Sequence, residues 1–293
     1  MKSALVMRWQ GVLFNIAAWL LIGLVPLFPD TASQAGLCAL LLVVFFLGVP
    51  HGALDVLYAR HLFRLQSRWA WAAFGLTYVG LAAMVAAFWL MTPLAFLVGF
   101  LLVSAFHFSG DPVKETPVLF RALYGGAIIV FPALLHVQQV TELFSFLSGA
   151  QIAERVADAL HWIALPWLVA VLLAASYHAR KNSLSSFELI SVSALAVLAP
   201  PLLAFGVFFC AMHSVRHILR TRDISEKKSF FYLFQVALPP FLLTVAGAAT
   251  GWHFLQNEPF DARVVQLLFV LLAALTVPHM MLVDRLRFFG PVR

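Results

Sequence analysis

Long apolar runs alternate with short polar connections along most of the chain. Ten runs approach the roughly 20 apolar residues that a membrane-spanning helix requires. They cover residues 11–28, 36–58, 69–91, 94–109, 119–137, 160–178, 186–199, 201–219, 231–250 and 264–283. Pro200 and Pro201 separate the short seventh run from the eighth, so these two runs could instead be one broken element. The pattern predicts an all-α, polytopic membrane bundle of about ten transmembrane helices.

The composition agrees with a membrane protein and excludes several other classes. Of the 293 residues, 62% are hydrophobic and 11% are charged, whereas soluble domains carry about 25% charged residues. Such high hydrophobicity also excludes intrinsic disorder. The net charge of +6 does not indicate nucleic-acid binding, because the basic residues form short clusters between apolar runs. Cys38 and Cys210 both lie within apolar runs, which excludes a disulfide framework.

The positions of the basic residues predict the orientation in the membrane, because cytoplasmic connections are enriched in Lys and Arg. With a cytoplasmic N-terminus, 17 of the 19 basic residues fall in cytoplasmic segments, and only Arg155 and Arg263 lie outside. Both termini are therefore predicted to be cytoplasmic. No convincing cleavage site follows Lys2 and Arg8, so we expect the first helix to be retained. The connections are too short for a soluble domain, and residues 1–293 are expected to form one membrane-embedded domain.

Five of the ten histidines lie near the predicted cytoplasmic ends of helices. They belong to the second, fourth, eighth and tenth runs, which all lead from outside to inside: His51, His107, His213, His217 and His279. Histidines that are distant in the sequence could therefore meet at one depth. Ionisable residues within membrane helices are costly and usually functional. The other five are interpreted as interfacial residues: His61, His136, His161, His178 and His253.

The spacing of the cluster is compatible with a metal site. His213 and His217 are four residues apart, so both rings can reach one ion from one helical face. Asp55 and Asp111 each follow a histidine by four residues and are candidate hydrogen-bond partners of metal-bound imidazoles, not necessarily on their own helix. Imidazole suits Zn, Cu, Fe and Ni, so the residues alone leave the metal open. An octahedral ferrous ion with four imidazoles would leave two positions for O2 and a substrate.

Four motifs around these histidines resemble the Brp/Blh family, whose members are bacterial and archaeal membrane proteins similar to bacterioopsin-related protein. The motifs are V-P-H-G-A-L-D at 49–55, F-H-F-S-G-D at 106–111, H-S-V-R-H at 213–217 and V-P-H-M-M-L at 277–282. Each motif is short, but the ordered set is specific and extends over almost the whole chain. The resemblance implies that the protein cleaves β-carotene to retinal.

More specifically, the resemblance implies a non-haem Fe(II) β-carotene 15,15′-dioxygenase that uses O2 and yields two molecules of all-trans-retinal. Carried over by motif, the iron ligands fall on His51, His107, His213 and His217. His279 also matches a family motif and is expected beside the iron, as a fifth ligand, a partner of the ligands or a residue of the substrate pocket. The substrate would come from the lipid bilayer of the bacterial cytoplasmic (inner) membrane, and a retinal-using rhodopsin would be a downstream partner.

Several further residues have an expected place in this scheme. A slot for the polyene could be lined by aromatic residues that flank the histidines: Phe106, Phe108, Phe208 and Phe209. Glu188 and Asp284 lie near the predicted cytoplasmic interface and are interpreted as structural or interfacial residues.

Two alternative functions share the inner-leaflet histidine cluster. A multipass transporter would distribute polar residues through both membrane halves and show related halves, neither of which is evident here. A haem-binding membrane protein needs only paired histidines, and five exceed that requirement. A di-iron desaturase or hydroxylase is disfavoured, since the chain lacks the H-x-x-H-H boxes that such a site would need.

Overall fold

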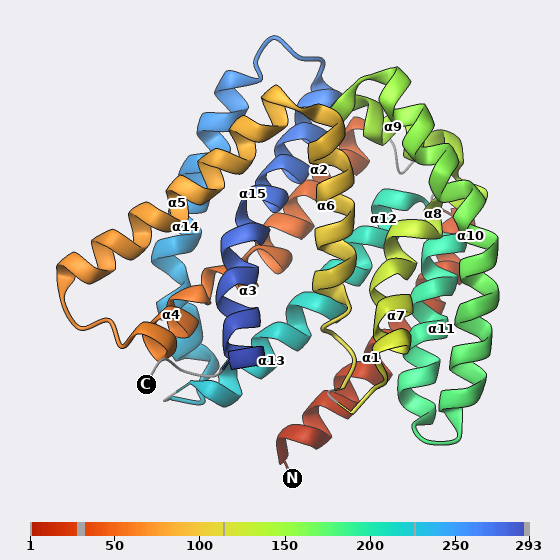
Figure 1. Ribbon diagram of the computed structural model, residues 1–293, viewed down its shortest axis with the longest axis horizontal. Coiled ribbons are helices and arrows are strands. Elements are labelled where there is room, and N and C mark those ends of the chain that lie inside the picture. Colours follow the sequence, from red (N-terminus) through yellow and green to blue (C-terminus); the bar gives the residue numbers. More distant parts are fainter. Residues whose placement is uncertain (1, 28–32, 114, 226, 290–293) are drawn as a thin grey trace.

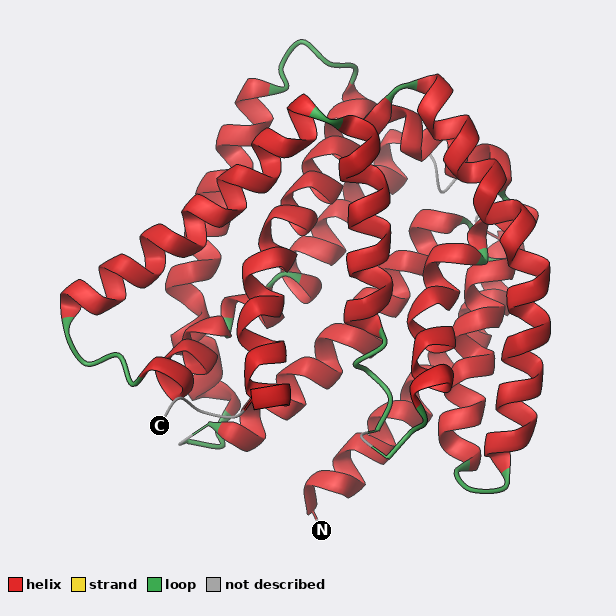
Figure 2. Ribbon diagram, viewed as in Figure 1, coloured by secondary structure: helices red, strands yellow, loops and turns green. Residues whose placement is uncertain are grey.

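The computed structural model describes residues 2–27, 33–113, 115–225 and 227–289, and every regular element within these ranges is helical (Figure 2). The first half of the chain forms α1 (Lys2–Leu24), η1 (Val25–Leu27), α2 (Gln34–Val43), η2 (Val44–Gly48), α3 (Pro50–Ala53), α4 (Asp55–Phe63), α5 (Arg68–Met91), α6 (Pro93–Phe108), α7 (Val118–Val130) and α8 (Pro132–Leu135). The second half forms α9 (Val137–Ser148), α10 (Ala150–Ala179), α11 (Ser183–Leu198), α12 (Pro201–Val207), η3 (Phe208–Ser214), α13 (Val215–Ile224), α14 (Phe230–Phe254) and α15 (Phe260–Phe289).

Within the described residues, seven helical segments are long and apolar enough to cross a membrane. They are Ala4–Leu27, Gln34–Phe63, Arg68–Met91, Ala150–Ala179, Pro201–Ile224, Phe230–Phe254 and Phe260–Arg285. The other three of the ten predicted runs are shorter apolar helices, namely Pro93–Phe108, Val118–Val130 and Ser183–Leu198. The predicted helical membrane bundle is thus confirmed, while ten crossings stay a prediction.

Successive segments run in alternating directions through the molecule. The α5–α6 and α14–α15 connections lie at one end, whereas the start of α1, the α10–α11 turn and the end of α15 lie at the other (Figure 1). The two proline-separated runs are separate helices, because Ala199 and Pro200 adopt extended backbone between α11 and α12. The assignment of the α1 end to the cytoplasm stays a prediction.

The helices differ sharply in how much of their surface is buried. α11 packs against α1, α7 and α10, and its Leu189, Val192 and Leu195 are fully buried. α5 has no buried residue and exposes large apolar side chains such as Trp69 and Leu76. Exposed apolar side chains along a whole helix are stable only where the surroundings are also apolar. α5 therefore has the surface of a lipid-facing helix.

Two π-helices, η2 and η3, contact each other in the interior. Gly48, the last residue of η2, allows this approach, since a Cβ atom there would collide with the Phe209 ring of η3. His51 follows η2 by three residues, and His213 lies within η3. Single π-helical turns shift the register of all later side chains and are frequent at functional sites. Both histidines owe their direction to these local departures from the α-helix.

A buried ion pair connects α1, α11 and α13. Arg216 donates to both carboxylate oxygens of Glu188, at 2.8 and 3.1 Å, and through Nε to Oε1 of Gln10 at 2.9 Å. Gly11 of α1 lies against the carboxylate, where a Cβ atom would collide with Oε1. Of the two roles expected for Glu188, structural or interfacial, its burial agrees with the structural one, because its side chain is only 5% exposed. Its role is structural and internal.

Replacing Glu188 with Ala is expected to lower the free energy of unfolding by about 3–5 kcal/mol, because it leaves the Arg216 charge buried and unpaired. The thermal unfolding midpoint in detergent measures the effect. Glu154→Ala, on the exposed surface of α10, is the matched control and should leave the midpoint nearly unchanged. Equal midpoints for the two variants would contradict the stabilising role of the pair.

Candidate metal centre

The five histidines of the predicted cluster come together from five elements: His51 from α3, His107 from the end of α6, His213 from η3, His217 from α13 and His279 from α15. The centroids of neighbouring rings are 4.6 to 5.4 Å apart. His51 and His279 each contact three of the other rings. Four separate stretches of sequence therefore supply imidazoles to one small volume.

His213 is held by a carboxylate from the loop that follows α6. Its Nδ1 lies 3.1 Å from both carboxylate oxygens of Asp111, and both residues are buried. A carboxylate that accepts from Nδ1–H fixes the ring orientation and leaves a lone pair on Nε2. The Nε2 atom of His213 therefore directs a lone pair into the cluster, where it can accept from Nε2 of His107 at 3.0 Å.

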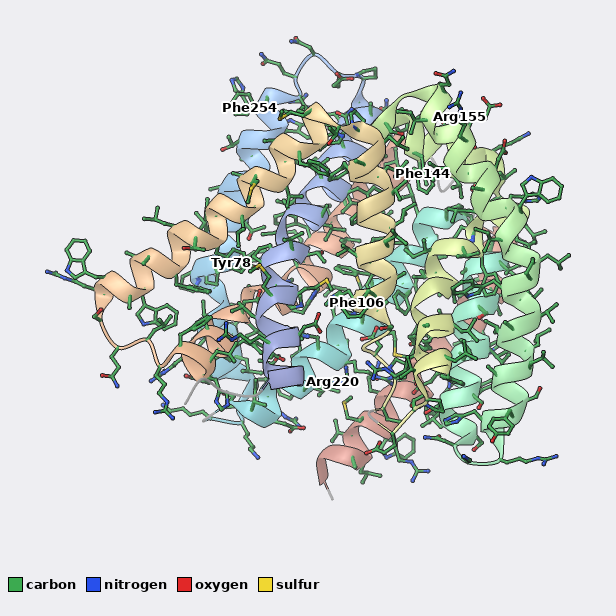
Figure 3. All side chains as sticks on the ribbon, in the orientation of Figure 1. Tyr78, Phe106, Phe144, Arg155, Arg220 and Phe254 are labelled. Atoms are coloured by element: carbon green, nitrogen blue, oxygen red, sulfur yellow. The ribbon has the colours of Figure 1, made fainter. Side chains whose placement is uncertain are left out.

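His279 is held in the same way from α4. Its Nδ1 donates to Oδ1 of Asp55 at 2.7 Å, and the hydroxyl of Tyr78 donates to Oδ2 at 2.8 Å. Tyr78 lies on the side of α5 that faces α15, where its hydroxyl also reaches the carbonyl of Leu275 (Figure 3). The otherwise lipid-facing helix α5 thus contributes one polar group to the interior.

The remaining rings have different supports. Nδ1 of His51 donates to the carbonyl of Gly48 at 2.6 Å, and the Ser214 hydroxyl lies 3.0 Å away. His217 stacks on Tyr58 with a centroid distance of 5.4 Å and an interplanar angle of 26°. The hydroxyls of Tyr58 and Thr221 are 3.1 Å apart, which fixes the tyrosine ring in the stack. The contacts of His51 and His217 therefore leave the Nε2 sides of these two rings available.

The donor set fits a bound transition-metal ion. The Nε2 atoms of His217 and His279 are buried without a hydrogen-bond partner, and unsatisfied buried polar groups are costly. One donor atom from each of His51, His107 and His279 lies within 4.8 Å of the others. Two Nε2 atoms bound at right angles to one ion, each at about 2.1 Å, are about 3 Å apart. That is the separation between His107 and His213.

The sequence spacing did not identify which aspartate supports which histidine. Asp55 follows His51 by four residues but supports His279, and Asp111 follows His107 but supports His213. Tyr58, Tyr78 and Ser214 were not expected at all. The i to i+4 rule describes neighbours on one helix, whereas these contacts join different segments.

The histidines interpreted as interfacial lie outside the cluster. His61 and His253 are exposed. Nδ1 of His161 lies 2.8 Å from the carbonyl of Ala133. His178 differs from the expectation, because it is buried against Phe120 near the end of α10.

A largely apolar cavity, which we call the histidine cavity, adjoins three of the rings. His51, His107 and His279 form part of its wall, and the rest is mainly aromatic and aliphatic. Of the four aromatic residues expected in a slot, Phe108 and Phe209 line this cavity. Phe106 is 53% exposed, and Phe208 is buried behind Phe108 with a centroid distance of 5.0 Å. Residues next to each other on a helix point in different directions, so only some of these rings reach the cavity.

A second cavity, the apolar cavity, continues from the first between α6, α7, α9 and α12. The two share Phe100, Ser104, Phe108 and Phe205 in their walls. The rest of the apolar cavity is lined by hydrocarbon side chains, among them Leu97, Leu143 and Phe144. Phe144, which Figure 3 labels, comes from α9. The two cavities thus meet beside the imidazole cluster, and both are lined mainly by apolar side chains.

Comparison with known proteins identifies the family. The family described as beta-carotene 15,15'-dioxygenase matches residues 42–287, a range that includes all five clustered histidines. The chain belongs to this family. The members of this family are carotenoid-cleaving dioxygenases. The resemblance to the Brp/Blh proteins is thereby confirmed.

Two curated relatives of the dioxygenase family cover nearly the whole chain. The beta-carotene 15,15'-dioxygenase of uncultured marine bacterium 66A03 is 34% identical over 84% of this chain and 92% of its own length. The probable beta-carotene 15,15'-dioxygenase Blh of Halobacterium salinarum is 28% identical over 96% of this chain and 91% of its own length. No solved structure matches the chain.

Asp111→Asn is expected to weaken Co(II) binding by about 10–100-fold, because an amide is a poorer acceptor for Nδ1–H of His213 and can present its own donor instead. Titration of the purified protein with Co(II), followed by the visible absorption of the ion, measures the affinity. The exposed Asp223→Asn variant serves as the control. Unchanged Co(II) affinity in Asp111→Asn would contradict the orienting role.

Proposed function

We propose that the protein cleaves the central double bond of β-carotene with O2 and releases two molecules of all-trans-retinal. One observation carries this proposal: in a chain of the carotenoid-cleaving dioxygenase family, five imidazoles converge, and three of them form part of the wall of an apolar cavity. One C=C bond is replaced by two C=O bonds, so one O2 supplies both aldehyde oxygens and the equation balances without another reductant.

We further propose that His51, His107, His213 and His217 hold a non-haem Fe(II) ion. His279 is a fifth candidate ligand, since its Nδ1 is bound by Asp55 and its buried Nε2 has no partner. The iron would bind and activate O2, a redox role that imidazole-ligated ferrous ions perform in other oxygenases. The all-nitrogen donor set and the absence of thiolate from the cluster support iron over metals that prefer sulfur ligands.

The protein's own contribution is to orient the imidazoles before the substrate arrives. Asp111 and Asp55 hold the Nδ1–H groups of His213 and His279, and the Gly48 carbonyl holds that of His51. These acceptors select the tautomer whose Nε2 lone pair faces the cluster. Asp111 and Asp55 thus come from segments other than those that carry His213 and His279, whereas Gly48 precedes His51 on the same segment.

The cavities supply a binding site for a hydrocarbon. Phe100, Phe108 and Phe205 line both cavities with apolar surface, so a polyene that extends from the imidazoles into the apolar cavity binds there by apolar contact. The same side chains exclude water from the reacting double bond. β-Carotene already dissolved in the bilayer enters without passing through water.

The surroundings of the protein follow from its surface. We propose that residues 1–293 form one domain of the bacterial cytoplasmic membrane with both termini in the cytoplasm. The lipid-facing surfaces of α5 and α14 support insertion in a bilayer. A rhodopsin that uses retinal would be the downstream consumer of the product.

The geometry disfavours a haem held between His107 and His213 as its two axial ligands. Two axial histidines must lie on opposite faces of a macrocycle, but the Nε2 atoms of His107 and His213 are only 3.0 Å apart. No porphyrin ring fits between them. Family membership likewise favours the enzyme over a transporter.

His213→Ala or His217→Ala is expected to abolish retinal formation and iron binding. Loss of a residue that orients a metal ligand lowers metal affinity by roughly 10–100-fold, and loss of the ligand itself should lower it further. The measurement is pigment extraction from bacteria that accumulate β-carotene, together with the iron content of the purified protein. His136→Ala and His253→Ala are the controls. Unchanged carotene with the expressed wild-type protein and added iron would count against the enzyme, and similar losses in all four variants would count against the site.

Ser104→Phe is expected to reduce kcat/KM for β-carotene by about tenfold or more, because Ser104 is buried where the two cavities join and the larger ring narrows the passage. Co(II) binding should not change. Leu102→Phe places the same ring on the exposed face of α6 and is the control. Normal cleavage by Ser104→Phe would show that the polyene does not cross this junction.

A further inference from the structure

The loop after α6 is attached to α13 through its backbone. Arg220 donates through Nη1 to the carbonyl of Gly110 at 2.8 Å and through Nη2 to that of Asp111 at 2.6 Å. Arg216 donates to the same Asp111 carbonyl at 3.2 Å. The two arginines are four residues apart and therefore lie on one side of α13. Their guanidinium groups hold the loop against the helix that carries His217.

This attachment matters because the loop and the helix both belong to the histidine cluster. The loop begins two residues after His107 and supplies the Asp111 carboxylate that holds His213. Residues 208–224 form one continuous helical segment that carries His213 and Arg220. The contacts thus form a closed circuit. Arg220 of the helical segment binds the loop, and Asp111 of the loop binds His213 of the same helical segment.

The two arginines contribute differently to this circuit of contacts. Arg216 forms the bidentate ion pair with Glu188, so its charge is neutralised within the core of the bundle. The described hydrogen bonds of Arg220 go to backbone carbonyls of the loop. A guanidinium is a rigid planar fork that can bind two neighbouring carbonyls at once, which a single ammonium cannot do in the same geometry.

We propose that Arg220 is a positioning residue for the metal centre, which fixes the Asp111 carboxylate against Nδ1 of His213 by binding the Gly110 and Asp111 carbonyls. Without the fork, the loop keeps the contacts of Arg216 with the Asp111 carbonyl and of Arg121 with the Ser109 carbonyl but is held less firmly, so that Asp111 no longer holds one orientation of the His213 ring. The substrate cavity is not touched by Arg220. Loss of the Arg220 guanidinium should therefore affect metal binding and turnover, and not the binding of the carotenoid. The proposal depends on one part of the proposed function, namely that the histidines bind a metal.

The test uses the full-length protein in detergent and Co(II) as the probe. The variants are Arg220→Gln, which removes the charge and the fork, and Arg220→Lys, which keeps the charge alone. Arg222→Gln is the matched control on the same helix, where Arg222 reaches Asp223 at 3.9 Å and the Phe230 ring. Co(II) affinity, the Co(II) absorption spectrum, the thermal midpoint, and kcat and KM for β-carotene are measured for each.

We expect Arg220→Gln to weaken Co(II) binding about tenfold, to alter the spectrum and to lower kcat, with KM changed less than about twofold. Arg220→Lys should give an intermediate Co(II) affinity, and Arg222→Gln should match the wild type. A lower thermal midpoint with unchanged Co(II) affinity and spectrum would show a merely structural role and overturn the proposal. If Arg220→Gln does not fold, a wild-type affinity and spectrum for Arg220→Lys would overturn it.

A double-mutant cycle tests whether Arg220 acts through Asp111. In the Asp111→Asn background, Arg220→Gln should cause little further loss of Co(II) affinity, because residues in one network are not additive. Full additivity of the two losses would overturn the proposal. Absence of histidine-dependent Co(II) binding in the wild type would instead contradict the proposed metal centre itself, so the two failures are distinguishable.

Discussion

Five imidazoles packed against one another inside an apolar bundle are the main constraint on this structure. Each ring removes two polar nitrogen atoms from water, and buried polar groups must find partners. Asp111, Asp55 and the Gly48 carbonyl satisfy the Nδ1 atoms of three rings. The Nε2 atoms of His217 and His279 are left for a common ligand. The arrangement is therefore costly unless these atoms have a ligand, and the metal ion proposed above would be one.

The buried charges around this cluster form a connected support. Glu188 neutralises Arg216, Gln10 binds its Nε, and the arginines of α13 bind the loop that carries Asp111. In a low-dielectric interior, such contacts are strong when complete and destabilising when one partner is missing. The same contacts that join α1, α11 and α13 consequently also fix the geometry of the candidate metal centre.

The side of the candidate metal centre that adjoins the two cavities is apolar, in contrast to the buried charges just described. Phe100, Phe108 and Phe205 border the imidazoles, and beyond them the apolar cavity offers only hydrocarbon surface over most of its length. Polar groups thus lie on one side of the cluster and apolar ones on the other. This division suits a reaction in which an imidazole-bound metal meets a hydrocarbon that cannot provide any ligand of its own.

The sequence by itself determined the helical membrane architecture, because each span needs its own run of apolar residues and the runs are visible without any tertiary contact. It also singled out the five histidines, whose shared depth follows from alternating helix direction. Only the tertiary structure decided that Asp55 supports His279 and Asp111 supports His213, and that Glu188 is buried against Arg216. These pairings join segments about 28 to 224 residues apart. They depend on helix packing and on the π-helical turns before His51 and around His213, which no local spacing rule encodes.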